Sequence, residues 1–242
     1  MEFINKRITV FGDSIGKGIT TNKGKIEMLP TCAIKLFEDE YGINIENFSA
    51  YGNSLKRLVL RGKIEKYIDS LDKNVKNIAV IELGGNDADF DWQAVAANPL
   101  ENHNPKTEIE EFSVLYKTTL DRLLSAGVEV IPCTIPPVCS DRFFREVISR
   151  LADGDKVLEF FRGDTGTIYR HQEMFNNEIL MTACGRRVPV IDLRRRFLDT
   201  NRFEEMICED GIHPNELGQR EIFEAVKQSV GRPACRNAFF SS

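Results

Sequence analysis

The segment "RITVF" (7–11) leads directly into the turn "GDSIGKG" (12–18), and this junction decides the fold. A short run of apolar and β-branched residues is typical of a buried parallel strand. A turn of small residues after such a strand opens the ligand crevice of an open α/β sheet. Because the turn holds one serine, Ser14, among three glycines, it is compatible with two functions, a phosphate cradle or a nucleophile.

Further short apolar runs follow along the chain, and helix-like segments separate them. They are residues 43–48, 77–83, 128–134 and 188–193. Strands and helices in alternation predict parallel pairing with right-handed crossovers. The sequence therefore predicts an α/β fold, a three-layer α/β/α sandwich around about five parallel strands. We expect a single domain over residues 1–242, with a weakly patterned and partly disordered tail at 231–242.

Local signals predict the first two helices. Residues 29–42 have Pro30 near the first turn and a glycine as the stop. A second helix is expected over 54–71, with Ser54 as its N-cap because a serine oxygen can accept a free N–H of the first turn.

The next helix and two long connections complete the pattern. Thr107 and Glu110 predict a capping box that starts a helix over residues 107–127. The connections at 86–106 and 136–185 are longer than such units need, and the second is expected to contain two helices. Long loops in compact domains tend to be functional, so both are candidates to line a site.

Composition limits the classes of partner. The 242 residues carry a formal net charge of −5, which disfavours electrostatic binding to nucleic acid. No segment reaches the ~18 apolar residues of a membrane helix, and no signal peptide is evident, so we expect a cytoplasmic protein without stable membrane association. The six cysteines include no CxxC pair and are expected to be free thiols, and no metal site is evident.

The phosphate function fails its motif tests. A dinucleotide fingerprint needs a third glycine that is absent after Gly18, and the P-loop pattern is also absent. A serine nucleophile needs a base, and histidine is the usual one. Of the three histidines only His213 lies three residues after an aspartate, Asp210. That spacing lets the carboxylate bind one ring nitrogen and leaves the other for Ser14.

Two turns offer donors for a developing oxyanion. Gly52 in "SAYGNS" leaves a backbone N–H open to a substrate, and Asn86 in "ELGGND" follows two glycines at the end of a strand. Each is also what an ordinary tight turn uses, so neither decides alone. Together with Ser14 and the histidine turn, they lie in loops that meet at one edge of the sheet.

With these four stretches the chain resembles the SGNH hydrolases, the GDSL esterase/lipase family. The matching motifs are "GDSI" (12–15), the glycine of "SAYGNS", "GGND" (84–87) and "DGIHPN" (210–215), in this order along the chain. The resemblance implies a five-stranded sheet of flavodoxin-like order and hydrolysis of a carboxylic ester through an acyl-enzyme. It implies that no metal or cofactor takes part.

The resemblance also implies roles for individual residues. Ser14 would be the nucleophile, His213 the general base and then acid, and Asp210 the group that orients the histidine. The oxyanion hole would consist of the N–H groups of Ser14 and Gly52 and the side chain of Asn86.

Substrate contacts are less determined. Phe90 and Trp92 follow Asn86, and the tryptophan could equally stack on a sugar or anchor its own loop. Asp13 is a further candidate contact, although hydrogen bonds to backbone N–H groups would also explain it. His171 is a minor candidate.

A small soluble ester such as an acetylated sugar is the favoured substrate. Alternatives are a lysophospholipase or thioesterase, a non-catalytic nucleotide- or phosphate-binding module, and a thiol enzyme that uses Cys208. The acyl specificity and the oligomeric state are left undetermined.

Overall fold

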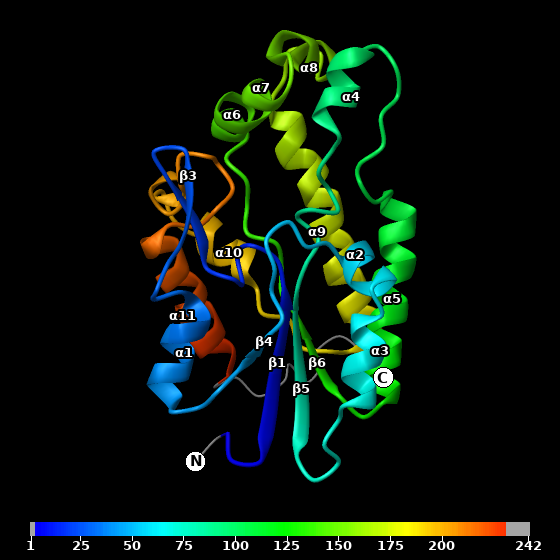
Figure 1. Ribbon diagram of the computed structural model, residues 1–242, viewed down its shortest axis with the longest axis vertical. Helices are drawn as coiled ribbons and strands as arrows, with labels where there is room; N and C mark the ends of the chain where they lie inside the picture. Colours follow the sequence, from blue (N-terminus) through cyan, green and yellow to red (C-terminus); the bar gives the residue numbers. More distant parts are fainter. Residues whose placement is uncertain (1–2, 231–242) are drawn as a thin grey trace, which may run out of the picture.

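The computed structural model describes residues 3–230 and has a central parallel sheet (Figure 1). Its four strands lie in the order β4-β1-β5-β6. They are β1 (Lys6–Gly12), β4 (Glu46–Asn47), β5 (Lys76–Glu82) and β6 (Glu129–Pro132). β1 pairs with β5 over its whole length, so that Gly12 lies opposite Glu82 at the carboxyl edge of the sheet.

The expected fifth strand is reduced to one bridge. Ile191 pairs in parallel with Cys133, and its N–H donates to the Pro132 carbonyl at 2.9 Å. Pro189 has no N–H to extend this ladder, and a helix begins at Leu193 directly afterwards. The α/β sandwich and the flavodoxin-like order are confirmed, with the fifth position held by this bridge.

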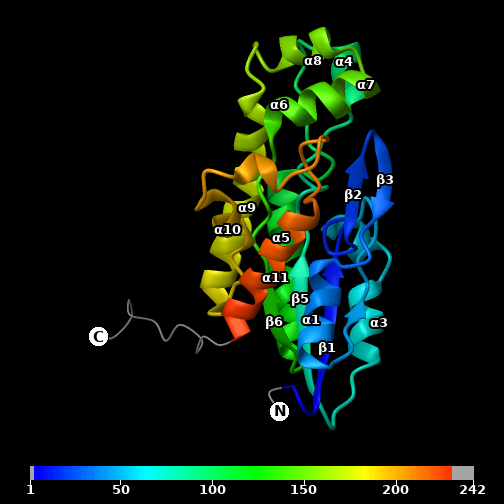
Figure 2. The ribbon, with the colours of Figure 1, turned by 90° about the vertical axis from the view of Figure 1, so that its left-hand side faces the viewer.

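Helices cover both faces of the sheet (Figures 1 and 2). Successive residues of β5 alternate, because Ala79 and Ile81 pack toward one helical layer and Val80 toward the other. The first layer comprises α2 (Leu55–Leu60), α3 (Lys63–Asp69), α5 (Ile109–Ser125) and α9 (Gly166–Arg186). The second comprises α1 (Ala33–Tyr41), α10 (Leu193–Leu198) and α11 (Glu216–Val230).

The start of α2 agrees with the sequence analysis, whereas α1 starts later than expected. The Ser54 hydroxyl accepts the Arg57 N–H at 3.1 Å, which confirms it as the N-cap of α2. Gly62, in the left-handed conformation, then divides the expected helix 54–71 into α2 and α3. α1 begins only at Ala33, whose N–H donates to the side chain of Gln219 at 2.9 Å, so Pro30 lies in the turn before it.

The expected capping box at Thr107 is wrong. α5 begins at Ile109 after Glu108, with no side-chain cap. The Thr107 hydroxyl instead donates to the Asp87 carboxylate at 2.8 Å. The Thr107 hydroxyl, which the capping-box spacing assigned to the start of the helix, is therefore bound to a buried carboxylate of another loop.

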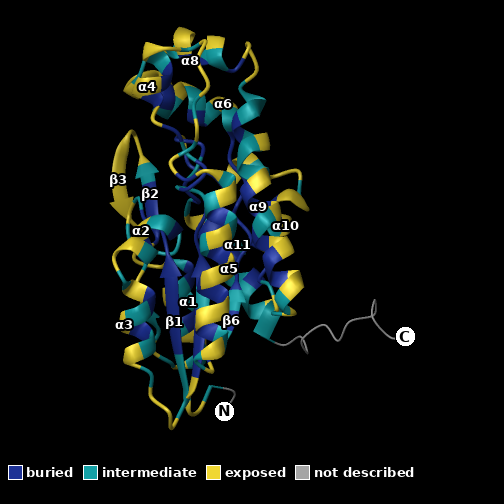
Figure 3. Ribbon diagram, turned by 90° about the vertical axis from the view of Figure 1, so that its right-hand side faces the viewer, coloured by how far each residue is buried: buried dark blue, intermediate teal, exposed yellow. Residues whose placement is uncertain are grey.

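The two long connections pack together beyond the carboxyl ends of the strands, at the top of Figure 1. They form α4 (Trp92–Ala97), α6 (Ser140–Phe143), the π-helical turn η1 (Phe144–Ile148), α7 (Ser149–Leu151) and α8 (Gly154–Phe160). Their buried side chains make an apolar cluster of their own, which Figure 3 shows as dark segments among exposed yellow ones. We call this region the cap. Two helices were expected within residues 136–185, and that segment contains α6, η1, α7 and α8 as well as most of α9.

A hairpin that the sequence analysis missed follows the Ser14 turn. Its strands are β2 (Ile19–Asn22) and β3 (Lys25–Met28), and Lys23 and Gly24, both with positive φ, make the two-residue turn between them. The Thr20 hydroxyl lies 3.0 Å from the Cys208 sulfur, so the hairpin joins the Ser14 turn to the loop before His213. The short 3₁₀ helix η2 (Phe203–Glu205) precedes that loop.

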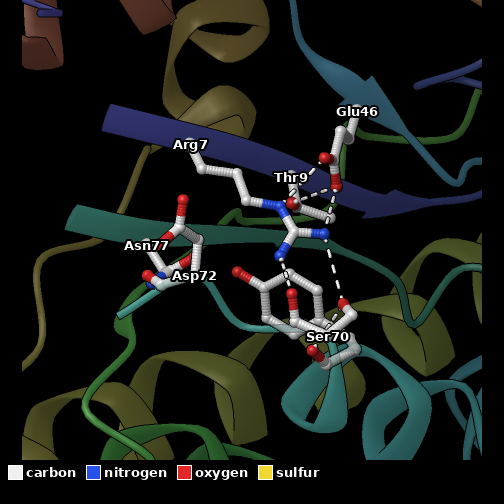
Figure 4. A network of polar contacts seen from close by, with 7 residues as sticks. Arg7, Thr9, Glu46, Ser70, Asp72 and Asn77 are labelled. Carbon is white, nitrogen blue, oxygen red and sulfur yellow. Dashed lines mark hydrogen bonds and ion pairs between the residues drawn. The ribbon is translucent and has the colours of Figure 1, made fainter. Parts of the chain in front are cut away.

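A polar network ties the amino edge of the sheet together (Figure 4). The Arg7 guanidinium donates two hydrogen bonds to Glu46, at 2.9 and 2.8 Å, and a third to the Ser70 carbonyl at 2.6 Å. Asn77 holds the entry to β5 by donating to the carbonyls of Asp72 and Val75.

Some expectations concern composition rather than topology. The five cysteines within residues 3–230 form no disulfide. In the same range, no helix combines the length and the apolar character that a membrane span requires. The tail expected at 231–242 lies outside the described residues.

Candidate active site

Ser14, His213 and Asp210 form one hydrogen-bonded chain at the carboxyl edge of the sheet. The His213 Nε2 lies 2.9 Å from the Ser14 Oγ, and its Nδ1 lies 2.5 Å from the Asp210 Oδ2. All three side chains are buried. The structure thus brings the three residues together, although Ser14 and His213 lie 199 positions apart in the sequence.

The turn that carries the histidine is built by Asp210 itself. Its Oδ1 accepts the N–H groups of Ile212 and His213, both at 3.0 Å, while its Oδ2 faces the ring. Burial raises the pKa of the Asp210 carboxyl, but the hydrogen bonds and the charge of His213 outweigh this and hold that pKa below its ordinary value. An ionised carboxylate therefore fixes the tautomer in which Nε2 faces Ser14.

The Ser14 turn leaves one particular N–H free. The backbone N–H groups of residues 13 and 15–19 all donate hydrogen bonds within the turn or to neighbouring strands. In the part of the chain from 3 to 230, no acceptor lies within hydrogen-bond distance of the Ser14 N–H. A buried N–H without a partner is uncommon, and here it points to a ligand that supplies the acceptor.

Gly52 and Asn86 lie where the sequence analysis expected them. Gly52 has φ of +64°, which favours glycine, and its N–H also has no acceptor among the described residues. The Asn86 Nδ2 donates to the Asp13 Oδ2 at 3.2 Å, which leaves its second hydrogen for another acceptor. Gly52 and Asn86 thus each keep a hydrogen for an acceptor that residues 3–230 do not supply.

Asp87, the last residue of "GGND", has a structural function. Its carboxylate accepts the N–H groups of Leu55 and Lys56, at 2.8 and 3.2 Å, and the hydroxyl of Thr107. Burial raises its pKa despite these bonds. Asp87 therefore joins the loop after β5 to the first turn of α2, and this fixes the backbone next to Asn86.

The structure places Asp13 within the Ser14 turn. The side chain is buried, and its Oδ1 accepts the Ile15 N–H at 2.8 Å while its Oδ2 accepts from Asn86. These bonds agree with the alternative, a carboxylate that organises the turn, and the substrate contact stays a prediction.

Phe90 and Trp92 pack within the cap formed by the two long connections. Both rings are buried in the apolar cluster of the cap, where Trp92 lies edge-on to Phe143 and Phe161. His171 packs against Phe90 with ring centroids 4.8 Å apart, and burial lowers its pKa. This packing agrees with rings that anchor the loop after β5, and their contact with a substrate stays a prediction.

Two residues near the site were not among the candidates. Glu82, the last residue of β5, accepts the N–H groups of Asp13 and Gly16, each at 3.2 Å, directly beneath Ser14. Tyr51 is 54% exposed, and its ring stacks beside the His213 ring with centroids 6.2 Å apart. Glu82 begins "ELGGND" and Tyr51 lies in "SAYGNS", and nothing local distinguished either side chain.

The thiol alternative has little support in the geometry. Cys208 is buried against Thr20, and the free ring nitrogen of His213 faces Ser14. Among residues 3–230 there is no group of three or more His, Cys, Asp or Glu side chains arranged to hold a metal ion.

Comparison with known proteins agrees with this geometry. The model of the GDSL-like lipase/acylhydrolase family matches residues 10–221. No curated protein matches the chain in sequence.

Solved structures share the fold at low identity. A lipase/acylhydrolase from Enterococcus faecalis is 18% identical, with a TM-score of 0.62 over 93% of this chain and 95% of that one. A variant of an acetyl xylan esterase from Geobacillus stearothermophilus is 15% identical, with a TM-score of 0.64 over 96% and 97%. Another acetyl xylan esterase is 21% identical, with a TM-score of 0.59 over 93% and 99%.

Proposed function

The chain belongs to the GDSL-like lipase/acylhydrolase family, and from this premise we propose that it is a serine esterase that removes a short acyl group from a small soluble carbohydrate ester. The observation that carries the proposal is the chain from Asp210 through His213 to the Ser14 hydroxyl, with contacts of 2.5 and 2.9 Å.

The first step is attack on the ester carbonyl. The Ser14 Oγ bonds to the carbonyl carbon while its proton passes to the His213 Nε2. The ionised Asp210 stabilises the imidazolium that forms, because its carboxylate already accepts from the other ring nitrogen. A hydroxyl without this base would be a poor nucleophile at neutral pH.

The negative charge that develops on the carbonyl oxygen needs donors that are free before the reaction. The N–H groups of Ser14 and Gly52 have no acceptor among residues 3–230, and Asn86 has one hydrogen to spare. Donors held in place stabilise the tetrahedral intermediate without reorganising during the step.

The intermediate then collapses to an acyl-enzyme. The bond between the carbonyl carbon and the alcohol oxygen breaks, and His213 returns its proton to that oxygen. Water attacks the acyl-enzyme with His213 again as base, and the carboxylic acid and the free Ser14 hydroxyl result. The chain's own residues supply every proton transfer in this scheme.

A carbohydrate alcohol is favoured by the surface next to the site. The exposed Tyr51 ring lies directly before Gly52 and beside His213, where it can stack on the face of a sugar. Two of the proteins with the same fold are acetyl xylan esterases, which supports an acetyl group and a xylose-type sugar as the first substrates to test.

The test is a series of p-nitrophenyl esters from acetate to octanoate, together with acetylated xylo-oligosaccharides. We expect the highest kcat/KM with acetyl esters, and we expect Ser14→Ala to lower kcat by about 10⁶-fold, as the loss of a triad nucleophile does. Ser113→Ala is the matched control and should leave turnover unchanged, because Ser113 lies in α5 and its hydroxyl bonds to Glu178 of α9. Turnover that survives Ser14→Ala would exclude the proposed mechanism.

Labelling separates this function from the phosphate-binding alternative. A fluorophosphonate probe should modify Ser14 in the wild type and not in Ser14→Ala. A thermal shift with nucleotides or phosphate, combined with no labelling, would favour the binding module, because a ligand of the native state raises the melting temperature.

A further inference from the structure

Glu82 lies beneath the Ser14 turn without solvent access. It ends β5 opposite Gly12, and its side chain is buried. Its Oε2 accepts the N–H of Asp13, one residue before Ser14, and the N–H of Gly16, two residues after it. One carboxyl oxygen therefore holds both sides of the nucleophile.

Close packing brings this carboxyl to the turn. A Cβ at Gly16 would lie 2.6 Å from the Ser49 Oγ and 3.1 Å from the Glu82 Oε2, and a Cβ at Gly12 would lie 2.5 and 2.9 Å from the same atoms. Any side chain at either position would separate Glu82 from the N–H groups that it binds. Gly12 and Gly16 are thus explained by the close approach of Ser49 and Glu82 as well as by the turn.

Asp13 completes the arrangement. Its carboxylate accepts the Ile15 N–H and the Asn86 Nδ2, and it contacts the Glu82 carboxyl. The two acids together bind the N–H groups of residues 13, 15 and 16, so that only the Ser14 N–H in this stretch is left free.

We propose that Glu82 is a positioning residue of this esterase, which acts with Asp13 to hold the Ser14 N–H and the Asn86 amide as oxyanion donors. The inference rests on the proposed function, since it assigns to Glu82 a part in the same reaction. Glu82 does not contact the substrate in this scheme; it acts through the Ser14 turn.

The pair has no cation to neutralise it. No Lys or Arg within residues 3–230 forms an ion pair with either acid, and the ionisable groups around them are His213, Asp87, Tyr116 and Cys133. Burial raises the pKa of Asp13 to about 6. Burial and the neighbouring Asp13 raise the pKa of Glu82 well above its ordinary value. Ionisation of both acids at once is therefore disfavoured, and the protonated form of Glu82 is stabilised.

This protonation state determines the alkaline behaviour. When Glu82 loses its proton at higher pH, a second negative charge appears beneath the site where the oxyanion forms. We therefore expect kcat to fall as the pH rises through the raised pKa of Glu82. A glutamine at this position keeps an acceptor for the two N–H groups and a donor for Asp13, and it has no proton to lose.

The experiment compares three variants with the wild type on p-nitrophenyl acetate from pH 6 to 10. Glu82→Leu removes the acceptor and should lower kcat about 100-fold with KM unchanged, because a small displacement of catalytic groups costs that much. Glu82→Gln should keep most of the wild-type kcat at pH 7 and lose the alkaline decline. Glu46→Gln, the same change at the amino edge of the sheet, should keep both kcat and the profile.

Each result decides between outcomes. A folded Glu82→Leu protein with wild-type kcat, or an alkaline decline in Glu82→Gln equal to that of the wild type, overturns the positioning role and leaves the esterase function intact. If Glu82→Leu does not fold, the profile of Glu82→Gln still decides. A wild-type protein without turnover that depends on Ser14 overturns the esterase function itself.

Discussion

The two ends of the β1–β5 ladder hold carboxylates in opposite ways. At the amino edge, Glu46 receives a bidentate pair of hydrogen bonds from Arg7, and both groups are partly exposed (Figure 4). At the carboxyl edge, Asp13 and Glu82 contact one another, and both are buried. An ion pair therefore links the start of β1 to β4, and two like groups meet where β1 and β5 end.

The pKa directions follow from this difference. The hydrogen bonds from Arg7 lower the pKa of Glu46, so its ionised form belongs to the folded state. Burial raises the pKa values of Asp13 and Glu82, so their ionised forms oppose folding. The amino end contributes stability, and the carboxyl end accepts an unfavourable arrangement that, in our proposal, keeps the Ser14 N–H and one Asn86 amide hydrogen free for a substrate.

Two asparagines give the largest expected contrast. Asn86→Ala removes one oxyanion donor and should lower kcat by about 10²–10³-fold with little change in KM. Asn77, at the other end of β5, donates to two carbonyls of the turn before the strand. Asn77→Ala should leave kcat unchanged and destabilise the fold by about 1–2 kcal/mol.

Steady-state kinetics and thermal melts of both variants check this pair. A loss of kcat in Asn77→Ala comparable to that in Asn86→Ala would show that the two ends are not separate in function.

Tyr51 tests the substrate side of the carboxyl edge. Tyr51→Ala removes the exposed ring and should lower kcat/KM for an acetylated xylo-oligosaccharide by about 10-fold, mostly through KM, because stacking contributes about 1 kcal/mol. Turnover of p-nitrophenyl acetate, which has no sugar, should change less. Equal losses on both substrates would contradict a sugar platform and indicate an effect on His213.

The smallest expected effect is on the free energy of unfolding. Its pH dependence should differ between the amino edge and the carboxyl edge of the sheet. Glu46 contributes stability above its unfolded pKa, and this is lost as the pH falls through its lowered folded pKa. Asp13 and Glu82 have raised values, so their contribution is present at low pH and is lost as the pH rises past their folded pKa values.

Melting temperatures from pH 3 to 9 measure these opposite slopes. Glu46→Gln should lower the melting temperature near neutral pH by about 2–4 °C, which corresponds to the ~1 kcal/mol of a partly exposed pair. The difference in melting temperature between Glu46→Gln and the wild type should vanish in acid. Glu82→Gln should raise the melting temperature increasingly toward alkaline pH. Identical slopes in the two variants would refute the contrast.

Much of the fold followed from local pattern. The apolar runs at 7–11 and 77–83 predicted β1 and β5 closely, because buried parallel strands are near-continuous in apolar residues. The run at 188–193 has the same character, yet Pro189 and the helix that follows reduce it to one bridge. The hairpin of β2 and β3 had a turn signal in "NKGK", but β3 alternates polar and apolar residues over only four positions, all of them exposed, and so short a pattern does not mark a strand.

The candidate site divides in the same way. The chain by itself determined Ser14, Gly52, Asn86, Asp210 and His213 as candidates, because each is a chemically special residue in a turn after a strand, and four short motifs recur in order.

Only the tertiary structure decided what surrounds these candidates. It pairs Asp13 with Glu82, buries Trp92 in the cap and exposes Tyr51 beside His213. The physical reason is that burial and hydrogen-bond partners depend on which strands become neighbours. A glutamate at the end of one strand and a serine after another have no relation in the sequence until the β1–β5 ladder places Glu82 opposite Gly12.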